Sequence, residues 1–133
     1  MAETKVVRAY AKGVEQAPRK VSIVASLVRG RTVEDALVIL SHTPRRSATP
    51  LVKVIESARA NAINNDGLDT KTLVIKTLSV TTGKRMRRFR PASRGRALPF
   101  EKKSSNILVE VEGTVKAKKV KAADKPAKEK ETK

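Results

Sequence analysis

The sequence contains no cysteine and only three aromatic residues, Tyr10, Phe89 and Phe100. The absence of cysteine excludes disulfide bonds, thiolate metal sites and cysteine nucleophiles, and it fits a reducing compartment. His42 is the only histidine, so neither a cysteine nor a second histidine can complete a zinc site around it. The longest uninterrupted apolar run, Ala36–Leu40, is too short to span a membrane, and the N-terminal residues do not resemble a signal peptide. We therefore expect a soluble, cytoplasmic protein with no metal site and no cofactor.

Acidic residues are scarce relative to basic ones. The 133 residues carry 30 Lys and Arg against 13 Asp and Glu, which gives a formal net charge of +17. A surface wrapped by nucleic acid requires such an excess, whereas a single pocket for a small anion does not. An anionic membrane would attract the same charge, but it also requires a wide apolar face, which the most basic segment lacks. We predict a nucleic-acid partner and no membrane association.

Residue combinations typical of catalysis are also missing. No convincing Ser-His-Asp arrangement can be built around His42, and Asp66 belongs to an Asn-Asn-Asp-Gly turn signal. The sequence around Gly83 and Lys84 lacks the first glycine of a phosphate-binding loop, and Arg85 replaces its hydroxyl residue. We predict that the protein is not an enzyme.

The positive charge is most concentrated between Lys84 and Lys103, where nine Lys and Arg residues face a single acid, Glu101. A packed core cannot hold so many cations, because burying an unpaired charge is strongly unfavourable. Arginine outnumbers lysine six to three, and guanidinium groups bind phosphate bidentately and stack on bases. We predict that these cations bind nucleic acid: Lys84, Arg85, Arg87, Arg88, Arg90, Arg94, Arg96, Lys102 and Lys103.

Two features of this stretch remain open to more than one interpretation. Phe89 and Phe100 either stack on unpaired bases or serve as apolar anchors within the stretch itself. The stretch as a whole is either a specific binding element or a disordered basic loop. A second basic group forms either another contact patch or an ordinary solvated surface, and it consists of Arg19, Lys20, Arg29 and Arg31.

The flanking residues predict the shape of the basic stretch. Residues 73–81 are rich in β-branched side chains and residues 105–112 alternate between apolar and polar, so both read as strands. A hairpin loop usually takes about 2–5 residues, so we expect the two strands to continue as a ribbon over about 83–103. At about 3.3 Å per residue, its tip would lie on the order of 30 Å from the rest of the protein. Such a ribbon has no core, and its order should depend on its partner.

The remaining segments predict one strand and three helices. Residues 5–14 alternate as a strand, and the first helix follows Pro18 over 19–29, with Gly30 as its left-handed cap. Thr32 is the expected N-cap of a second helix that ends at Thr43-Pro44. The third helix begins at Ser47 or Thr49 and ends at Asn64.

Together these segments predict an α+β fold, with a small three-stranded antiparallel sheet covered by three helices and a long protruding hairpin. We expect a single domain over 1–112 and a disordered, lysine-rich tail over 113–133. The tail either keeps the protein soluble or adds an auxiliary RNA contact.

Several motifs resemble the bacterial form of a known family, ribosomal protein twenty-two of the large subunit. The resemblance covers roughly residues 5–112. In the basic stretch it rests on Met86-Arg87-Arg88, Pro91, Arg94-Gly95-Arg96-Ala97 and Lys102-Lys103-Ser104-Ser105 before Ile107. In the helices it rests on Pro18-Arg19-Lys20, Val28-Arg29-Gly30, and Glu56-Ser57-Ala58 through Asn61-Ala62 to Asn64-Asn65. The chain departs from the family pattern where Ala17 replaces a frequent Ser and where Asn106 stands in place of His.

This resemblance implies a structural protein of the large ribosomal subunit that binds several domains of the large ribosomal RNA during assembly. Its hairpin would line the nascent-peptide exit tunnel, with the tip near Lys84 to Arg94 and with Met86-Arg87-Arg88 approaching the tunnel wall. The implied partners are ribosomal RNA, neighbouring ribosomal proteins and the nascent peptide, with no homo-oligomer. By position in these motifs, the implied RNA-binding residues include Arg19, Lys20, Met86, Phe89 and Gly95.

Two other classes of protein share some of these features. A DNA-architectural protein can insert a basic β-arm into the minor groove, with Pro91 as a wedge. Such proteins usually dimerise through an apolar helix face, and no surplus face of this kind is evident in the sequence. A small basic enzyme acting on RNA would need an acid–base pair, which the sequence does not provide.

Overall fold

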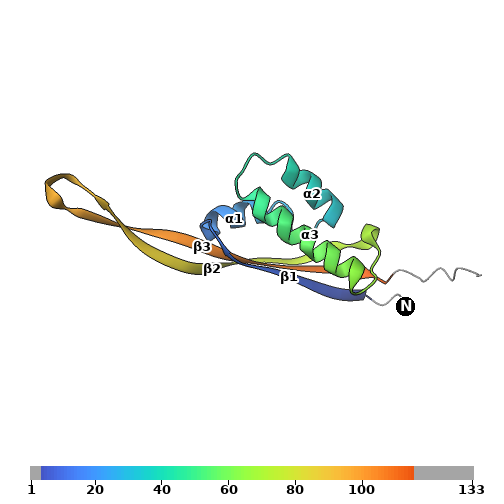
Figure 1. The fold of residues 1–133 in the computed structure, drawn as a ribbon. Coiled ribbons are helices and arrows are strands. Elements are labelled where there is room, and N and C mark those ends of the chain that lie inside the picture. The colour runs from blue at the N-terminus through green and yellow to red at the C-terminus, as the bar shows by residue number, and fades with distance from the viewer. Residues whose placement is uncertain (1–3, 116–133) are drawn as a thin grey trace, which may run out of the picture.

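The computed structural model describes residues 4–115 and has the predicted α+β architecture. Three helices, α1 (Pro18–Ala25), α2 (Val33–Ser41) and α3 (Ala48–Asn64), lie on one face of a sheet, as Figure 1 shows. The sheet is antiparallel with strand order β1-β3-β2, and its strands are β1 (Thr4–Val14), β2 (Val74–Pro91) and β3 (Ala97–Thr114). Two one-turn 3-10 helices, η1 (Thr70–Thr72) and η2 (Ser93–Gly95), precede and follow β2.

β3 includes the first two residues of the predicted tail, because Gly113 and Thr114 still pair with β1. The rest of the predicted tail, from residue 116 on, lies outside the described residues. Over residues 4–115, no helix is both long and apolar enough to cross a bilayer.

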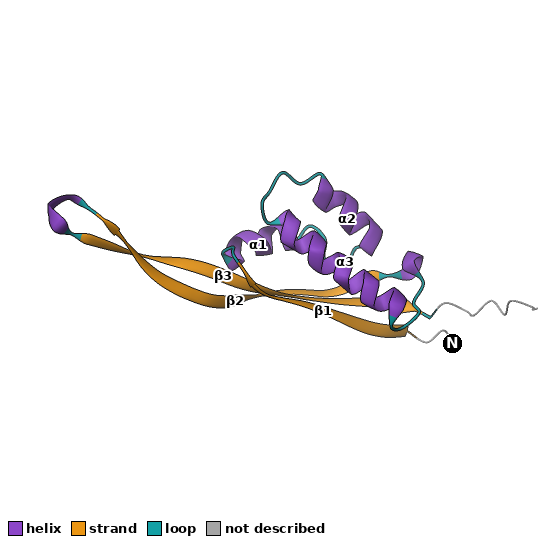
Figure 2. Cartoon of the chain, viewed as in Figure 1, coloured by secondary structure: helices purple, strands orange, loops and turns teal. Residues whose placement is uncertain are grey.

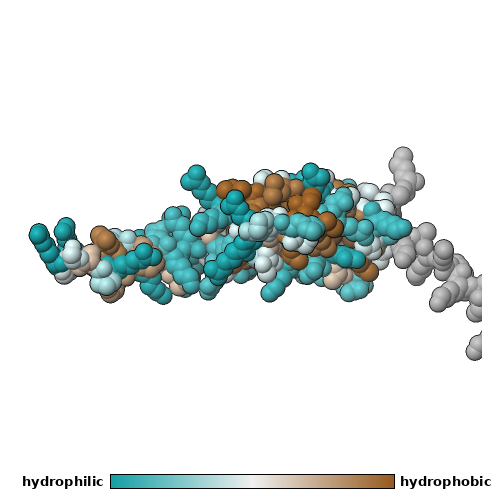
Figure 3. Space-filling model, turned by 90° about the horizontal axis from the view of Figure 1, so that it is seen from above, coloured by the Kyte–Doolittle hydropathy of each residue, from teal (hydrophilic) through white to brown (hydrophobic). Residues whose placement is uncertain are grey.

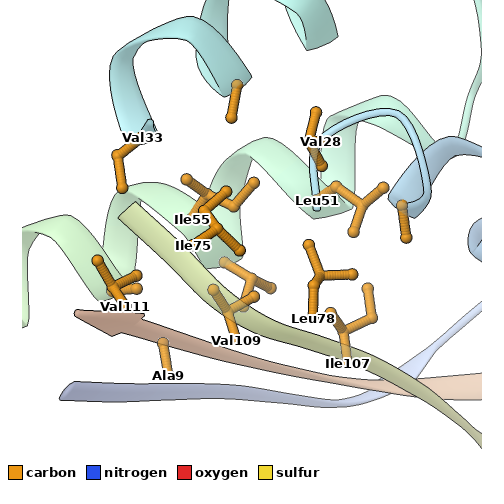
Figure 4. Close-up of a cluster of buried hydrophobic side chains, with 14 of the residues drawn as sticks. Ala9, Val28, Val33, Leu51, Ile55, Ile75, Leu78, Ile107, Val109 and Val111 are labelled. Carbon is orange, nitrogen blue, oxygen red and sulfur yellow. The ribbon is translucent and has the colours of Figure 1, made fainter. Parts of the chain in front are cut away.

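The core lies between the helices and the covered face of the sheet (Figure 4). The alternation predicted for β3 is confirmed, since Ile107, Val109 and Val111 are completely buried. From the helix side, α3 contributes Leu51 and Ile55, which are equally buried. Removing each such side chain from water stabilises the fold by about 1.5–3 kcal/mol. This packing explains how valine-rich segments with modest helix propensity remain helical.

The first helix is shorter than predicted, because it ends at Ala25 and not at Arg29. The amides of Leu27 and Val28 donate to carbonyls three residues back, which is a tighter winding than an α-helix. Beyond them, Gly30 adopts the predicted left-handed conformation, with φ +72°. Its N–H donates to the Ile75 carbonyl at 3.1 Å, so the linker between α1 and α2 is hydrogen-bonded to the beginning of β2. The residues between Ala25 and Gly30 therefore connect the helix to the sheet and do not continue the α-helix.

The other two helices agree with the sequence-based boundaries to within two residues. The Thr32 side chain accepts a hydrogen bond from the Asp35 N–H at 3.2 Å, which confirms Thr32 as the N-cap of α2. The α3 helix ends at Asn64, and Gly67 turns the chain with φ +61°. At the other end of α3, Ser47 occupies the N-cap position, but its side chain makes no capping hydrogen bond.

The sheet continues beyond the helices as two strands alone. β1 ends at Val14, opposite Ser105 of β3, whereas β2 and β3 remain paired as far as Pro91 and Ala97. Figures 1 and 2 show this two-stranded extension leaving the layered part of the molecule. We refer to residues 84–103 as the arm and to the other described residues as the body.

Candidate nucleic-acid interface

The arm is a regular antiparallel ribbon. Seven residue pairs, from Arg85–Lys103 to Pro91–Ala97, connect its base to its tip. At about 3.3 Å per residue these pairs span roughly 23 Å, before the tip loop is added. The ribbon predicted from the two flanking strands is therefore present, and it projects from the body without a hydrophobic core of its own.

The tip of the arm is a tight loop around η2. Arg94 and Gly95 are both left-handed, with φ 59° and 71°, and the Ala92 N–H donates to the Arg96 carbonyl at 2.8 Å. Glycine adopts this conformation freely, whereas the Cβ atom of a residue such as Arg94 makes it less favourable. The resemblance placed the tip near Lys84 to Arg94. That prediction was wrong for Lys84, because the pairing of Arg85 with Lys103 puts Lys84 at the base.

Strand alternation divides the arm's side chains between two faces. One face carries Arg85, Arg87 and Phe89 of β2, opposite Lys103, Glu101 and Pro99 of β3. The other face carries Met86, Arg88 and Arg90, opposite Lys102, Phe100 and Leu98. Both faces are therefore basic, and hydrophilic side chains dominate the view of the arm in Figure 3. An RNA that surrounds the arm would meet cations on either side.

Carboxylates neutralise few of the arm's cations. Glu101 lies 4.0 Å from both Arg85 and Lys103, which sit directly opposite each other and would otherwise repel. Lys102 pairs with Glu15 of the body at 3.2 Å. Within residues 4–115 the other six arm cations form no ion pair, and these are Lys84, Arg87, Arg88, Arg90, Arg94 and Arg96. Their charge is available to a polyanion.

The two arm phenylalanines differ in their surroundings. The guanidinium of Arg90 lies 4.8 Å from the centre of the Phe100 ring, in a cation–π contact, and Phe100 is 38% exposed. Phe89 is 71% exposed. Phe100 thus takes part in the packing of the arm itself, whereas the Phe89 ring is open to stacking on a base.

The base of the arm is held by three polar contacts to the body and across the ribbon. Gly83 and Lys84 together oppose Ser104, which forms a β-bulge, and the Ser104 hydroxyl donates to the Lys84 carbonyl at 2.6 Å. On the other side of β3, the Asn106 side chain accepts from the N–H of Gly13, a second irregular position with φ +69°. The Glu15–Lys102 ion pair described above is the third contact. These contacts set the direction in which the arm leaves the body.

The predicted contact residues Arg19 and Lys20 lie at the start of α1, near the base of the arm. Lys20 and Lys103 line the same cavity, whose volume is about 390 Å³. The structure therefore brings part of the predicted second patch next to the arm. Arg29 and Arg31 do not line this cavity, and their Nε atoms donate to the carbonyls of Leu78 and Leu27.

Sequence reasoning missed Arg45 and Arg46, which line this cavity together with Lys20 and Lys103. Both arginines lie in the connection between α2 and α3. The only signal in the sequence was two adjacent arginines after Pro44, and nothing local indicated that they face α1. His42 ends α2, and over residues 4–115 no three His, Asp or Glu side chains are grouped as metal ligands.

A comparison with protein families agrees with this geometry. The family model described as Ribosomal protein L22p/L17e matches residues 9–112 of the 133, so it includes the three helices and the whole arm. The match confirms the family suggested by the arm and helix motifs, and it favours ribosomal RNA over the DNA-architectural and enzymatic alternatives. The assignment to the bacterial form stays a prediction. The chain belongs to the ribosomal protein L22p/L17e family, and it is accordingly a structural, non-enzymatic, rRNA-binding protein of the large ribosomal subunit.

Proposed function

We propose that the arm inserts between segments of the large ribosomal RNA and lies along the nascent-peptide exit tunnel, while the body rests at the outer side of the subunit. The observation that carries this proposal is the set of six arm cations without a carboxylate partner in the described part of the chain. A two-stranded ribbon is only marginally stable by itself, and folded RNA can match its charge on both faces at once.

The mechanism has an electrostatic and a structural stage. The net charge of +17 draws the protein to RNA, and release of condensed counterions makes this attraction strongly dependent on salt. Phosphate contacts from the arm's guanidinium groups then position the ribbon, and RNA shape selects the site. By joining RNA segments that are separate in the sequence of the RNA, the arm would assist assembly of the subunit.

The partners we propose follow from this placement. They are the large-subunit RNA along the arm, neighbouring ribosomal proteins at the body, and the nascent peptide at the tip around Arg94. The protein would act as a single copy on ribosomes in the cytoplasm. We assign RNA contact to Arg19, Lys20 and the arm residues Lys84, Arg85, Met86, Arg87, Arg88, Phe89, Arg90, Arg94, Gly95, Arg96, Lys102 and Lys103.

Deleting the arm tests its contribution to RNA binding. Thr82 and Ser105 are directly opposed in the sheet, so an Asn-Gly turn can replace residues 83–104 and close the hairpin. The body should remain folded, because its core lies entirely outside the replaced segment. We expect filter binding to large-subunit RNA to weaken at least about 100-fold, with a clearly shallower dependence on salt. An unchanged salt dependence would show that the arm is not the main contact.

A unique thiol tests the tunnel location. Because the chain has no cysteine, Ser93→Cys places a single thiol at the exposed tip, and Ser57→Cys places one on the exposed surface of α3 as a control. After reconstitution into large subunits, a photo-crosslinker on the tip should react with a stalled nascent peptide, and the control should not. Equal reaction from both positions, or reaction from Ser57→Cys alone, contradicts the proposed orientation.

A further inference from the structure

The cavity of about 390 Å³ at the base of the arm combines residues from four separate parts of the chain. Lys20 belongs to α1, Arg45 and Arg46 belong to the connection before α3, and Lys103 belongs to β3. All four of these side chains are exposed, so the cavity is open to solvent. Residues more than eighty positions apart in the sequence thus converge on one basic concave site.

The charge of this cavity is not balanced by the acid that lines it. Glu15 is the single carboxylate in the lining, and its Oε2 atom is already paired with Lys102 at 3.2 Å. Over residues 4–115, Lys20, Arg45 and Arg46 take part in no ion pair, and Lys103 has only the 4.0 Å contact to Glu101. Cations held together in this way repel one another, and an anion between them removes the repulsion.

The N-termini of two helices also favour an anion in this cavity. The cap residues of α1 and α3, Ala17 and Ser47, both line the cavity, and neither side chain caps its helix. The Ser47 hydroxyl donates instead to the Gln16 side chain, whose Nε2 donates to the Arg46 carbonyl at 2.9 Å. These two bonds join the starts of both helices. Pro18 has no N–H and the Ala48 N–H donates to the Arg45 carbonyl at 2.9 Å, so it is the positive end of each helix dipole that favours an anion at this position.

We propose that this cavity binds a backbone phosphate of ribosomal RNA and so anchors the strand that runs along the arm. Three observations carry the proposal independently: a concave site, four cations of which three have no ion pair in the described structure, and two helix starts without a side-chain cap. Lys103 belongs to both the arm and the cavity, so a strand following the arm passes the cavity mouth. This inference rests on the proposed binding of ribosomal RNA, and it adds a second, separately testable contact to it.

A pair of double variants of the full chain tests the site. Lys20→Gln/Arg46→Gln removes two cavity cations, whereas Lys53→Gln/Lys71→Gln removes two exposed cations that do not line the cavity. For the cavity variant we expect about tenfold weaker binding to large-subunit RNA and a salt slope reduced by about 1, as for one lost phosphate contact. For the control we expect about threefold weakening or less, because solvent and salt screen an exposed charge outside the contact.

The results separate this inference from the proposed function. If the wild-type protein binds the RNA and both double variants lose the same amount of affinity, the cavity site is refuted and RNA binding by the arm remains intact. A wild-type protein that does not bind the RNA would overturn the proposed function itself. Titration of the labelled protein with inorganic phosphate distinguishes the source of the anion. Amide shifts at Arg46 and Ser47, together with RNA affinity that the cavity variant does not alter, would indicate a site for a free anion and refute RNA as its ligand.

Discussion

Replacing Gly83 with alanine tests how closely the strands pack where the arm joins the body. A Cβ atom at position 83 would lie 2.6 Å from the Ser104 hydroxyl oxygen and 3.2 Å from the Ser104 carbonyl carbon. The first distance is too short for any real contact, so Ser104 must rotate. That rotation breaks its 2.6 Å hydrogen bond to the Lys84 carbonyl, which is part-buried. We therefore expect Gly83→Ala to destabilise the protein.

The expected change in the free energy of unfolding is the sum of three contributions. Loss of the hydrogen bond lowers the free energy of unfolding by about 1 kcal/mol. Residual crowding against the Ser104 main chain adds about 1 kcal/mol. Reduced freedom of the unfolded chain offsets about 0.5–1 kcal/mol. The net change is a loss of about 1–1.5 kcal/mol, which corresponds to roughly 3–8 °C in Tm for a domain of this size.

A double-mutant cycle with Ser104→Ala tests whether contact with the Ser104 hydroxyl causes the destabilisation by Gly83→Ala. Ser104→Ala removes the hydroxyl, so by itself it should lower the free energy of unfolding by about 1 kcal/mol. In that background Gly83→Ala meets no hydroxyl oxygen and should change stability by less than about 0.5 kcal/mol. Urea unfolding of all four proteins, followed by circular dichroism, measures the cycle. If the two single changes add within about 0.4 kcal/mol, the close contact with the Ser104 hydroxyl is not what requires glycine at position 83.

Two further substitutions test the body. Thr32→Ala removes the hydroxyl that accepts from the Asp35 N–H, so thermal unfolding should show a loss of about 1 kcal/mol, whereas Thr32→Ser should retain most of the stability. A full loss with serine would show that the methyl group, and not the cap, is responsible. Ile55→Ala empties a completely buried position and should cost about 2–5 kcal/mol in urea unfolding, while Ile23→Ala, at a side chain 55% exposed, should stay within about 0.5 kcal/mol. Similar losses at both positions would contradict the assigned core.

Local patterns were sufficient to predict most of the secondary structure. Alternation placed Ile107, Val109 and Val111 on one face of a strand, and the structure buries all three. The Thr32 cap and the turn ending at Gly67 were likewise predicted, because capping and turn formation depend on residues within a few positions of each other. The length of the basic stretch between two strands indicated a ribbon, since no ordinary hairpin loop is that long.

Predictions failed where distant segments decide the local structure. The first helix was extended to Arg29 because its apolar spacing continues to Val28, but α1 ends at Ala25, and Gly30 and Arg31 form hydrogen bonds with Ile75 of β2. The resemblance assigned Lys84 to the tip, and only the register of β2 against β3 shows that it lies at the base. Neither the hydrogen bonds nor the register can be read from a single segment.

The sequence by itself determined that this protein has one long cationic segment between two strands, supported by three amphipathic helices, because charge density and periodicity are local properties. Only the tertiary structure decided which cations act together. Lys20, Arg46 and Lys103 meet around one cavity because the β1–α1 connection is hydrogen-bonded to the α2–α3 connection through Gln16 and ion-paired to the arm through Glu15 and Lys102. Proximity of this kind arises from the packing of the chain, and no spacing in the sequence encodes it.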